Sequence, residues 1–326
     1  MTADSKLPRT NLYKPALAWF AAFGTFWVFV LVILGAFTTS IGAGMVFADW
    51  PLSNGSLNPP GWMDDLAMFA EHSHRLSAGV MSAVTIILAV WIWRVEQRAW
   101  LRRLAVFAVG LVLVQATVGG LRVLLDHLHI AMVDTSVGRL FAMLHACLAQ
   151  LFVCTLIAIT VSCTRGWINS GEVVHDNARR AGVICCALLF IQLGVAAVMR
   201  HSFAGLAIPT FPYSTPDGGL LPETWNFRIA IHFAHRAMAV VLAGALTWFA
   251  YKLWIDPKTS AGLRIGALTL VGLLTIQIIL GAQIIWTHRS AATTTGHVAV
   301  GALTLAVTFC LTWVASRTLI ERRHGS

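Results

Sequence analysis

Eight separate stretches of this chain are apolar and long enough to cross a lipid bilayer, and this constrains the fold more than any other feature. A spanning helix needs about 20 consecutive, mainly apolar residues. The stretches lie near 19–41, 71–93, 104–125, 140–162, 181–199, 229–250, 266–286 and 293–316. We therefore predict an all-α integral membrane protein with eight transmembrane helices.

The composition favours the same class of protein. Hydrophobic residues make up 57% of the chain and charged residues only 11%, whereas a soluble domain carries about a quarter charged residues. The net charge of +9 is spread along the chain, so it indicates no nucleic-acid partner. The surrounding solvent is membrane lipid. Basic residues before the first apolar stretch resemble a signal peptide, but that stretch is too long, and we expect a retained helix.

The lysines and arginines predict the orientation. Cytoplasmic segments of membrane proteins carry an excess of these residues. If the N-terminus is cytoplasmic, only seven of the 23 fall at outer helix ends or in outer loops: Arg75, Arg122, Arg139, Arg200, Arg228, Arg236 and Arg289. The first outer loop, 42–68, has none. We predict a multi-pass protein with both termini in the cytoplasm, in a bacterial inner membrane.

The chain repeats a four-helix unit. Pro51 and His74 lie 23 residues apart, and so do Pro212 and His235. Further matches pair Gly35 with Gly194, Gln115 with Gln277, Gly119 with Gly281 and His145 with His297. Four helices return the chain to its starting side, so the repeats have parallel topology. We predict an N-terminal four-helix bundle at 1–162, a cytoplasmic linker at 163–180 and a C-terminal bundle at 181–326.

Four of the twelve histidines occupy equivalent positions in the repeat: His74 and His145, then His235 and His297. In each half they lie in the outer parts of two parallel helices. Two imidazoles facing across a helical bundle form a bis-histidine haem site, so we predict four ligands of haem iron and one haem in each half. The alternative is that each histidine only hydrogen-bonds a neighbouring helix. Zinc is less favoured, because no cysteine or carboxylate partner recurs in both halves.

An arginine follows the first histidine of each pair, Arg75 in one half and Arg236 in the other. Guanidinium groups bind carboxylates in a bidentate manner. We predict that both arginines bind haem propionates. Alternatively, each anchors its helix at the membrane interface by extending its charge to water.

The two halves differ at one informative position. Glu71 lies three residues before His74, so the two share a helix face, and its counterpart in the repeat is His232. A carboxylate at membrane depth is a candidate functional group; the alternative is a glutamate that faces the outer water. His72 lies about 200° around the helix from His74, so the two cannot bind one iron.

The other residues with metal-binding or redox chemistry give weaker signals. Four histidines near outer loops are expected to be solvated: His127, His129, His201 and His288. The six cysteines fall in or at the ends of predicted helices, where we expect them to pack as small apolar side chains.

Several motifs in this order resemble the haem A synthase family. They are "GAFTTSIGAGMVFADWP" at 35–51, "EHSHR" at 71–75, "MLHAC" at 143–147, "HFAHR" at 232–236 and "TGHVAVG" at 295–301. The resemblance covers about residues 17–316. It implies oxidation of the C8 methyl of haem O to a formyl group, which yields haem A for a haem–copper oxidase. Some members carry a cysteine pair in the first outer loop; loop 42–68 has none.

The resemblance also implies roles for the predicted site residues. His74 and His145 would hold the substrate haem, His235 and His297 would hold a haem b, and Glu71 would be the catalytic carboxylate. An anionic Glu71 beside the porphyrin edge would stabilise positive charge or act as a base. The implied partners are the farnesyltransferase that produces haem O, an electron acceptor and oxidase assembly factors.

Two other functions share the four histidines. One is a dihaem b electron-transfer cytochrome or quinol-linked reductase, which gains nothing from Glu71. The other is a haem carrier without catalysis.

Overall fold

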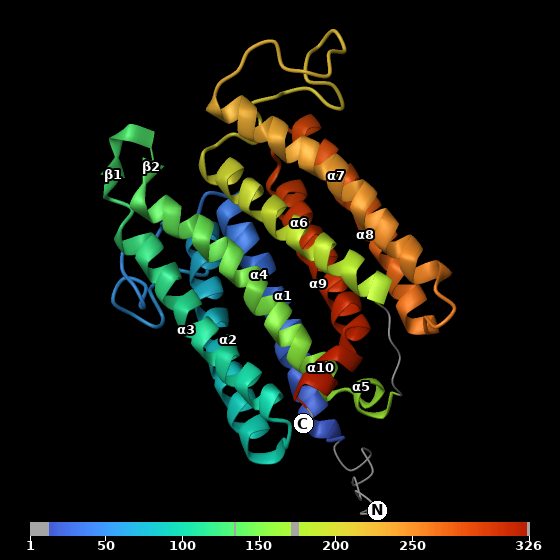
Figure 1. Ribbon diagram of the computed structural model, residues 1–326. Helices are drawn as coiled ribbons and strands as arrows, with labels where there is room; N and C mark the ends of the chain where they lie inside the picture. Colours follow the sequence, from blue (N-terminus) through green and yellow to red (C-terminus); the bar gives the residue numbers. More distant parts are fainter. Residues whose placement is uncertain (1–12, 134, 171–175, 325–326) are drawn as a thin grey trace, which may run out of the picture.

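The structure, a computed structural model, describes residues 13–133, 135–170 and 176–324 (Figure 1). Within these residues eight α-helices are long and apolar enough to cross a membrane. They are α1 (Pro15–Ser40), α2 (Leu66–Val95), α3 (Ala99–Leu124), α4 (Val137–Cys163), α6 (Asp176–His201), α7 (Phe227–Ile255), α8 (Ala261–Trp286) and α9 (Ala291–Ala315). The all-α membrane class is confirmed, and no predicted stretch extends beyond its helix by more than one residue.

The remaining elements are short. Helices α5 (Arg165–Asn169) and α10 (Arg317–His324) flank the ends of α4 and α9. Strands β1 (His129–Ile130) and β2 (Thr135–Ser136) pair antiparallel around the 3-10 turn η2 (Ala131–Val133). The predicted linker 163–180 contains α5 and the start of α6. Its residues 171–175, like Lys6 and Arg9 of the predicted cytoplasmic N-terminal segment, lie outside the described residues.

The helices form two adjoining rings, which lie side by side in Figure 1. In the first, α1, α2, α3 and α4 contact one another in sequence and α4 closes on α1; α6, α7, α8 and α9 do the same in the second. The rings meet where α9 contacts α1 and α4, and where α4 contacts α6. Of the most apolar 18-residue window in each helix, 61% is buried in α4 but only 17% in α7 and in α8. Helix α4 is therefore central.

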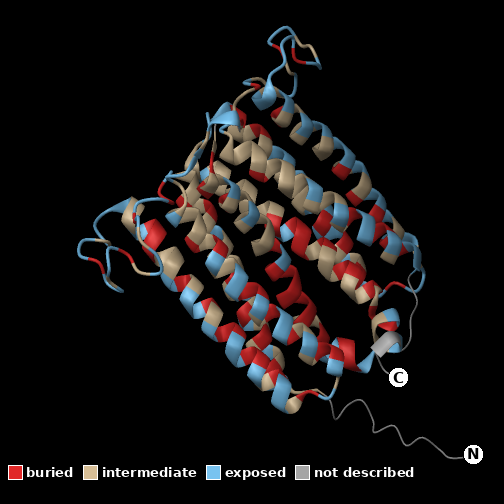
Figure 2. Cartoon of the chain, turned by 60° about the vertical axis from the view of Figure 1, so that its left-hand side comes forward, coloured by how far each residue is buried: buried red, intermediate tan, exposed pale blue. Residues whose placement is uncertain are grey.

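The apolar core joins the two rings. Its larger cluster contains Leu17, Met81, Leu101 and Leu156 from the first ring together with Ala306 of α9. In lipid, such close packing is a main source of helix association. Figure 2 shows exposed residues along the loops and outer helices, and buried residues gathered between the helices. The six cysteines are free thiols and are buried or half-buried, as expected for packing residues.

The four helices that carry the predicted ligands begin alike. Asp65, Ser136, Asn226 and Ser290 each accept a hydrogen bond from a backbone N–H of the first turn, which stabilises the helix start. The histidine follows its cap by nine residues in α2, α4 and α7, and by seven in α9. At 1.5 Å per residue, all four lie about 10–14 Å along the helix from the same end of the molecule. We call this the loop end, because it carries loops 41–65 and 202–226.

Candidate functional site

His235 of α7 and His297 of α9 face each other in the second ring. Their ring centroids are 6.4 Å apart and their planes are inclined by 58°. A metal about 2 Å from one nitrogen of each ring would hold the centroids about 6 Å apart. Among the described residues, the buried Nδ1 atoms of both histidines have no hydrogen-bond partner, and the side-chain amide nitrogen of Gln277 lies 3.2 Å from Nε2 of His297. The geometry and donor set fit a metal held by two imidazoles.

His74 of α2 and His145 of α4 form the equivalent pair in the first ring, and they interact electrostatically. Nδ1 of His145 lies 3.1 Å from the Gln115 carbonyl oxygen. An Nδ1–H donated to this carbonyl leaves Nε2 as the unprotonated nitrogen. Metal-binding histidines usually donate their other ring N–H to a carbonyl or carboxylate in this way. The first pair therefore also suits axial ligation.

Glycines on neighbouring helices make room for three of the four rings. A Cβ at Gly35 of α1 would lie 2.9 Å from Cε1 of His74, and one at Gly119 of α3 would lie 2.9 Å from Cε1 of His145. A Cβ at Gly281 would lie 3.4 Å from Cε1 of His297. Gly194, the counterpart of Gly35, would meet nothing within 4 Å. The rings of His74 and His145 are therefore seated where only a glycine fits without displacement.

Glu71 and Arg75 fasten loop 41–65 to α2. Arg75 donates to the carbonyl oxygens of Phe47, Asp49 and Leu52 at 2.5–3.1 Å, and to Oε1 of Glu71 at 2.5 Å. Oε2 of Glu71 accepts the Val46 and Phe47 N–H groups at 2.7 and 3.3 Å. Both partners of this ion pair are largely buried: the Arg75 side chain is 12% exposed and the Glu71 side chain 5%. The glutamate thus does not simply face water, which was the alternative raised by its place near the helix end.

In the second ring, an arginine of α7 docks the preceding loop in the same way. Arg236 donates to the carbonyl oxygens of Ile208, Thr210 and Tyr213 at 2.7–3.3 Å, and its Nε–H points to Nε2 of His232 at 3.2 Å. These three carbonyls stand as far before Arg236 in the chain as those of Phe47, Asp49 and Leu52 stand before Arg75. Both loops therefore dock on their helices in the same way.

The side chain that the arginine contacts on its own helix differs between the rings. The Glu71 carboxylate accepts three donors, from Arg75, Val46 and Phe47. His232 faces two donors, the Arg236 Nε–H and the Ile208 N–H, but a neutral imidazole has one acceptor nitrogen. Among the residues that the structure describes, only the first ring has a fixed, buried carboxylate one turn from a predicted ligand.

The loop itself is ordered by Asp49. Its carboxylate accepts the N–H groups of Asn54 and Gly55 at 2.8 and 2.7 Å. Burial raises the pKa of Asp49, but these hydrogen bonds outweigh it, so the pKa lies below its usual range. The turn that Arg75 holds is therefore closed by an ionised aspartate at neutral pH.

His72 points away from the histidine pair, as its angle on the helix predicts. Nδ1 lies 2.9 Å from Oγ of Ser53 and Nε2 lies 3.2 Å from the Leu57 carbonyl oxygen. Its ring also packs edge-on against Trp62, with centroids 4.7 Å apart. His72 is a structural contact of loop 41–65.

Two arginines near the pairs were not predicted as parts of the site. Arg122 of α3 interacts electrostatically with His74, His145 and Glu71. Arg200 of α6 interacts with His297 and donates to the Ala36 carbonyl and the Ser40 hydroxyl of α1. The signal that could have found both arginines is their position at the end of an apolar stretch, where an ionisable residue faces the bundle interior.

His201 was expected to be a solvated loop histidine, and this is wrong. It is the last residue of α6, half-buried, and it interacts electrostatically with His145 and Arg122 of the other ring. The contact between α4 and α6 brings it there. The other three loop histidines, His127, His129 and His288, are exposed as expected.

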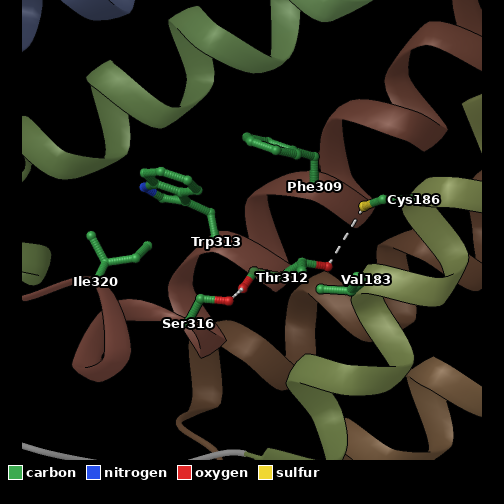
Figure 3. A pocket seen from close by; sticks show the side chains of 7 residues that line it. All are labelled: Val183, Cys186, Phe309, Thr312, Trp313, Ser316 and Ile320. Atoms are coloured by element: carbon green, nitrogen blue, oxygen red, sulfur yellow. Dashed lines mark hydrogen bonds between the residues drawn. The ribbon is translucent and has the colours of Figure 1, made fainter. Parts of the chain in front are cut away.

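An apolar cavity of about 370 Å³ lies far from both histidine pairs (Figure 3). It is lined by Val183 and Cys186 of α6, Ile320 of α10, three residues near the end of α9 (Phe309, Thr312 and Trp313), and Ser316 directly after α9. Thr312 follows His297 by 15 residues on α9, which corresponds to about 22 Å. The cavity is therefore separate from the candidate site.

The fold and site together define a multi-pass helical membrane protein with two rings of helices and one pair of histidines near the loop end of each. The family model COX15-CtaA, described as cytochrome oxidase assembly protein, matches residues 18–309. The chain belongs to this family. The resemblance drawn from the motifs is thereby confirmed.

Curated relatives cover most of the chain at low identity. A protein named heme A synthase from Lysinibacillus sphaericus is 23% identical over 86% of this chain and 89% of its own length. A protein of the same name from Staphylococcus carnosus is 26% identical over 84% of this chain and 86% of its own length. Another from Shewanella oneidensis is 23% identical over 86% of this chain and 91% of its own length.

Proposed function

We propose that this protein is a haem A synthase, which oxidises the C8 methyl of haem O to a formyl group for assembly of a haem–copper oxidase. The observation that carries the proposal is the asymmetry of two otherwise equivalent sites. Each ring has a histidine pair at the same depth, and within the described part of the chain only the first pair has a buried carboxylate beside it. The names of the curated relatives support the same activity.

The two pairs have different tasks in this proposal. His74 and His145 hold the substrate haem O in the first half, 1–162, and His235 and His297 hold a haem b in the second, 181–326. A haem b supplies one-electron redox chemistry when bound. The methyl oxidation also needs an electron acceptor beyond this chain. Membrane-bound partners in the same sequence would be the farnesyltransferase that makes haem O and the oxidase assembly factors that receive haem A.

Glu71 is the catalytic carboxylate in this proposal. Its three donors, from Arg75, Val46 and Phe47, hold it in a fixed position. From there a carboxylate can stabilise positive charge on the substrate edge or take a proton from an attacking water. Because the donors are already in place, little reorganisation is needed when charge develops.

Arg75 and Arg236 remain our candidates for binding haem propionates. Loop carbonyls and the partner at position 71 or 232 occupy four of the five N–H donors of each guanidinium. The donor left over is Nε–H in Arg75 and one Nη1–H in Arg236. Any propionate contact would use that donor, so loop docking is the larger part of their work.

The decisive test of the function is the chemistry of the pigments in membranes that contain the protein. Haem A, or haem O with a hydroxylated methyl, is expected in cells that also make haem O. Haem B as the sole pigment under these conditions would instead support a dihaem electron-transfer cytochrome.

We also propose that both termini are cytoplasmic and that the loop end faces the outer side of a bacterial inner membrane. Asn54 and Lys258 are exposed in loops at opposite ends. In intact cells, Asn54→Cys is expected to react with a membrane-impermeant maleimide, and Lys258→Cys only after permeabilisation. The reverse pattern would contradict this orientation.

Gly119→Ala tests whether haem binding in the first half requires the space that Gly119 leaves for the ring of His145. The new Cβ would lie 2.9 Å from Cε1 of His145, and such overpacking costs about 1–3 kcal/mol. We expect about tenfold or greater weakening of haem binding in the first half and an altered low-spin spectrum. Gly194→Ala is the matched control, since its Cβ meets nothing within 4 Å. Equal spectra for both variants would contradict the prediction.

A further inference from the structure

We propose that Arg122 anchors a propionate of the tetrapyrrole bound by His74 and His145, and so selects the orientation of the substrate. This inference rests on the proposed function and deepens it. A haem presents two carboxylates on one edge of its ring, and a guanidinium is the side chain best matched to a carboxylate. The argument depends on where α3 places Arg122.

Arg122 lies on the helix face that seats the first histidine pair. It follows Gly119 by three residues on α3, so the two share a face about one turn apart. The ring of His145 lies against Gly119. Arg122 is one turn nearer the loop end, and its guanidinium lies against Gly44 of loop 41–65, where a Cβ would overlap Nη2. The charge therefore lies between the loop and the histidine pair.

The guanidinium has no carboxylate committed to it. Within the described part of the chain, no carboxylate oxygen forms an ion pair with Arg122. Two carboxylates act on it electrostatically, Glu71 and Asp126. Glu71 already accepts from Arg75, Val46 and Phe47, and Asp126 accepts from the Ser136 hydroxyl. A largely buried cation without an ion-pair partner is unfavourable, and a carboxylate of the ligand would relieve this cost.

Arg122 is specific to the first ring. The residue three after Gly281, the counterpart of Gly119, is Ile284. The two rings thus differ at both Glu71 and Arg122, and these two residues interact electrostatically. On the porphyrin, the methyl that becomes the formyl group is the neighbour of one propionate. A propionate held by Arg122 brings that edge of the ring to the loop end, where Glu71 lies.

The test compares haem B with its dimethyl ester, which lacks both carboxylates. Each is titrated into the full-length apo-protein in detergent, and the first site is read as the absorbance that His74→Ala removes. The natural chain is expected to bind the diacid about tenfold or more tightly than the ester, the size expected for one charge-assisted contact. In Arg122→Gln this preference is expected to fall to about threefold or less. Arg228→Gln, at an exposed arginine near the same end, serves as the matched control and should keep the full preference.

A second variant keeps the arginine but moves it. Gly44→Ala would displace the flexible end of Arg122 without changing any charge, and it is expected to lower the preference in the same way. If Arg122→Gln does not accumulate in membranes, the Gly44→Ala variant is measured in its place. An unchanged preference in either variant overturns the role of Arg122 and leaves the proposed function standing. If the natural chain shows no His74-dependent haem binding at all, the proposed function fails as well.

Discussion

Glu71→Gln is expected to lower haem A formation by about 10²-fold or more while haem remains bound in both halves. The substitution keeps the size of the side chain and removes its charge. Losing a group that stabilises transition-state charge or transfers a proton has effects of this size. Haem O, or a partly oxidised product, should accumulate, as measured by chromatography of the extracted haems.

The structure imposes a control on this experiment. The Glu71 carboxylate also docks loop 41–65, and an amide has only one oxygen to replace two. Arg75→Gln loosens the same loop but keeps the carboxylate. If limited proteolysis shows equal loosening in both variants and only Glu71→Gln loses activity, the charge is responsible. Equal loss of activity in both would assign the effect to loop docking, and near-normal haem A in Glu71→Gln would contradict a catalytic role.

Removal of a histidine from one pair is expected to empty that half alone. His74→Ala or His145→Ala should abolish the first bis-histidine spectrum, and His235→Ala or His297→Ala the second, because an axial ligand is lost in each case. The measurement is the haem-to-protein ratio of the purified protein together with its reduced-minus-oxidised spectrum. His127→Ala, at an exposed loop histidine, should leave both unchanged. Full haem content and normal spectra in the four variants would contradict the ligand assignment.

The helices could be predicted because their apolar stretches are long and well separated. The depth of the four histidines could also be predicted, since the repeat places each at a fixed distance from a helix start. His72 was excluded correctly by its angle on the helix. These properties depend on the geometry of a single helix and on the spacing of the internal repeat, and a sequence shows both directly.

Contacts between distant segments could not be predicted in the same way. The hydrogen bonds of Arg75 to three carbonyls of loop 41–65 were not predicted, because the directions of those carbonyls depend on the fold of the loop. His201 was misplaced because its position depends on how α6 of one ring packs on α4 of the other. The charge of Arg122 was visible, but its closeness to Glu71 results from the packing of α3 beside α2.

The packing of α9 on α1 has a consequence for biosynthesis. Ala306 of α9 belongs to the core cluster of the first ring, and Phe309 and Trp313 pack against this cluster, yet the ribosome makes α9 after the other seven spanning helices that the structure describes. The face of α1 that α9 covers must therefore remain against lipid, or against an insertion chaperone, until seven other helices have been synthesised. The first site reaches its final packing only after α9 has been made, so loading with haem is expected to follow the insertion of α9.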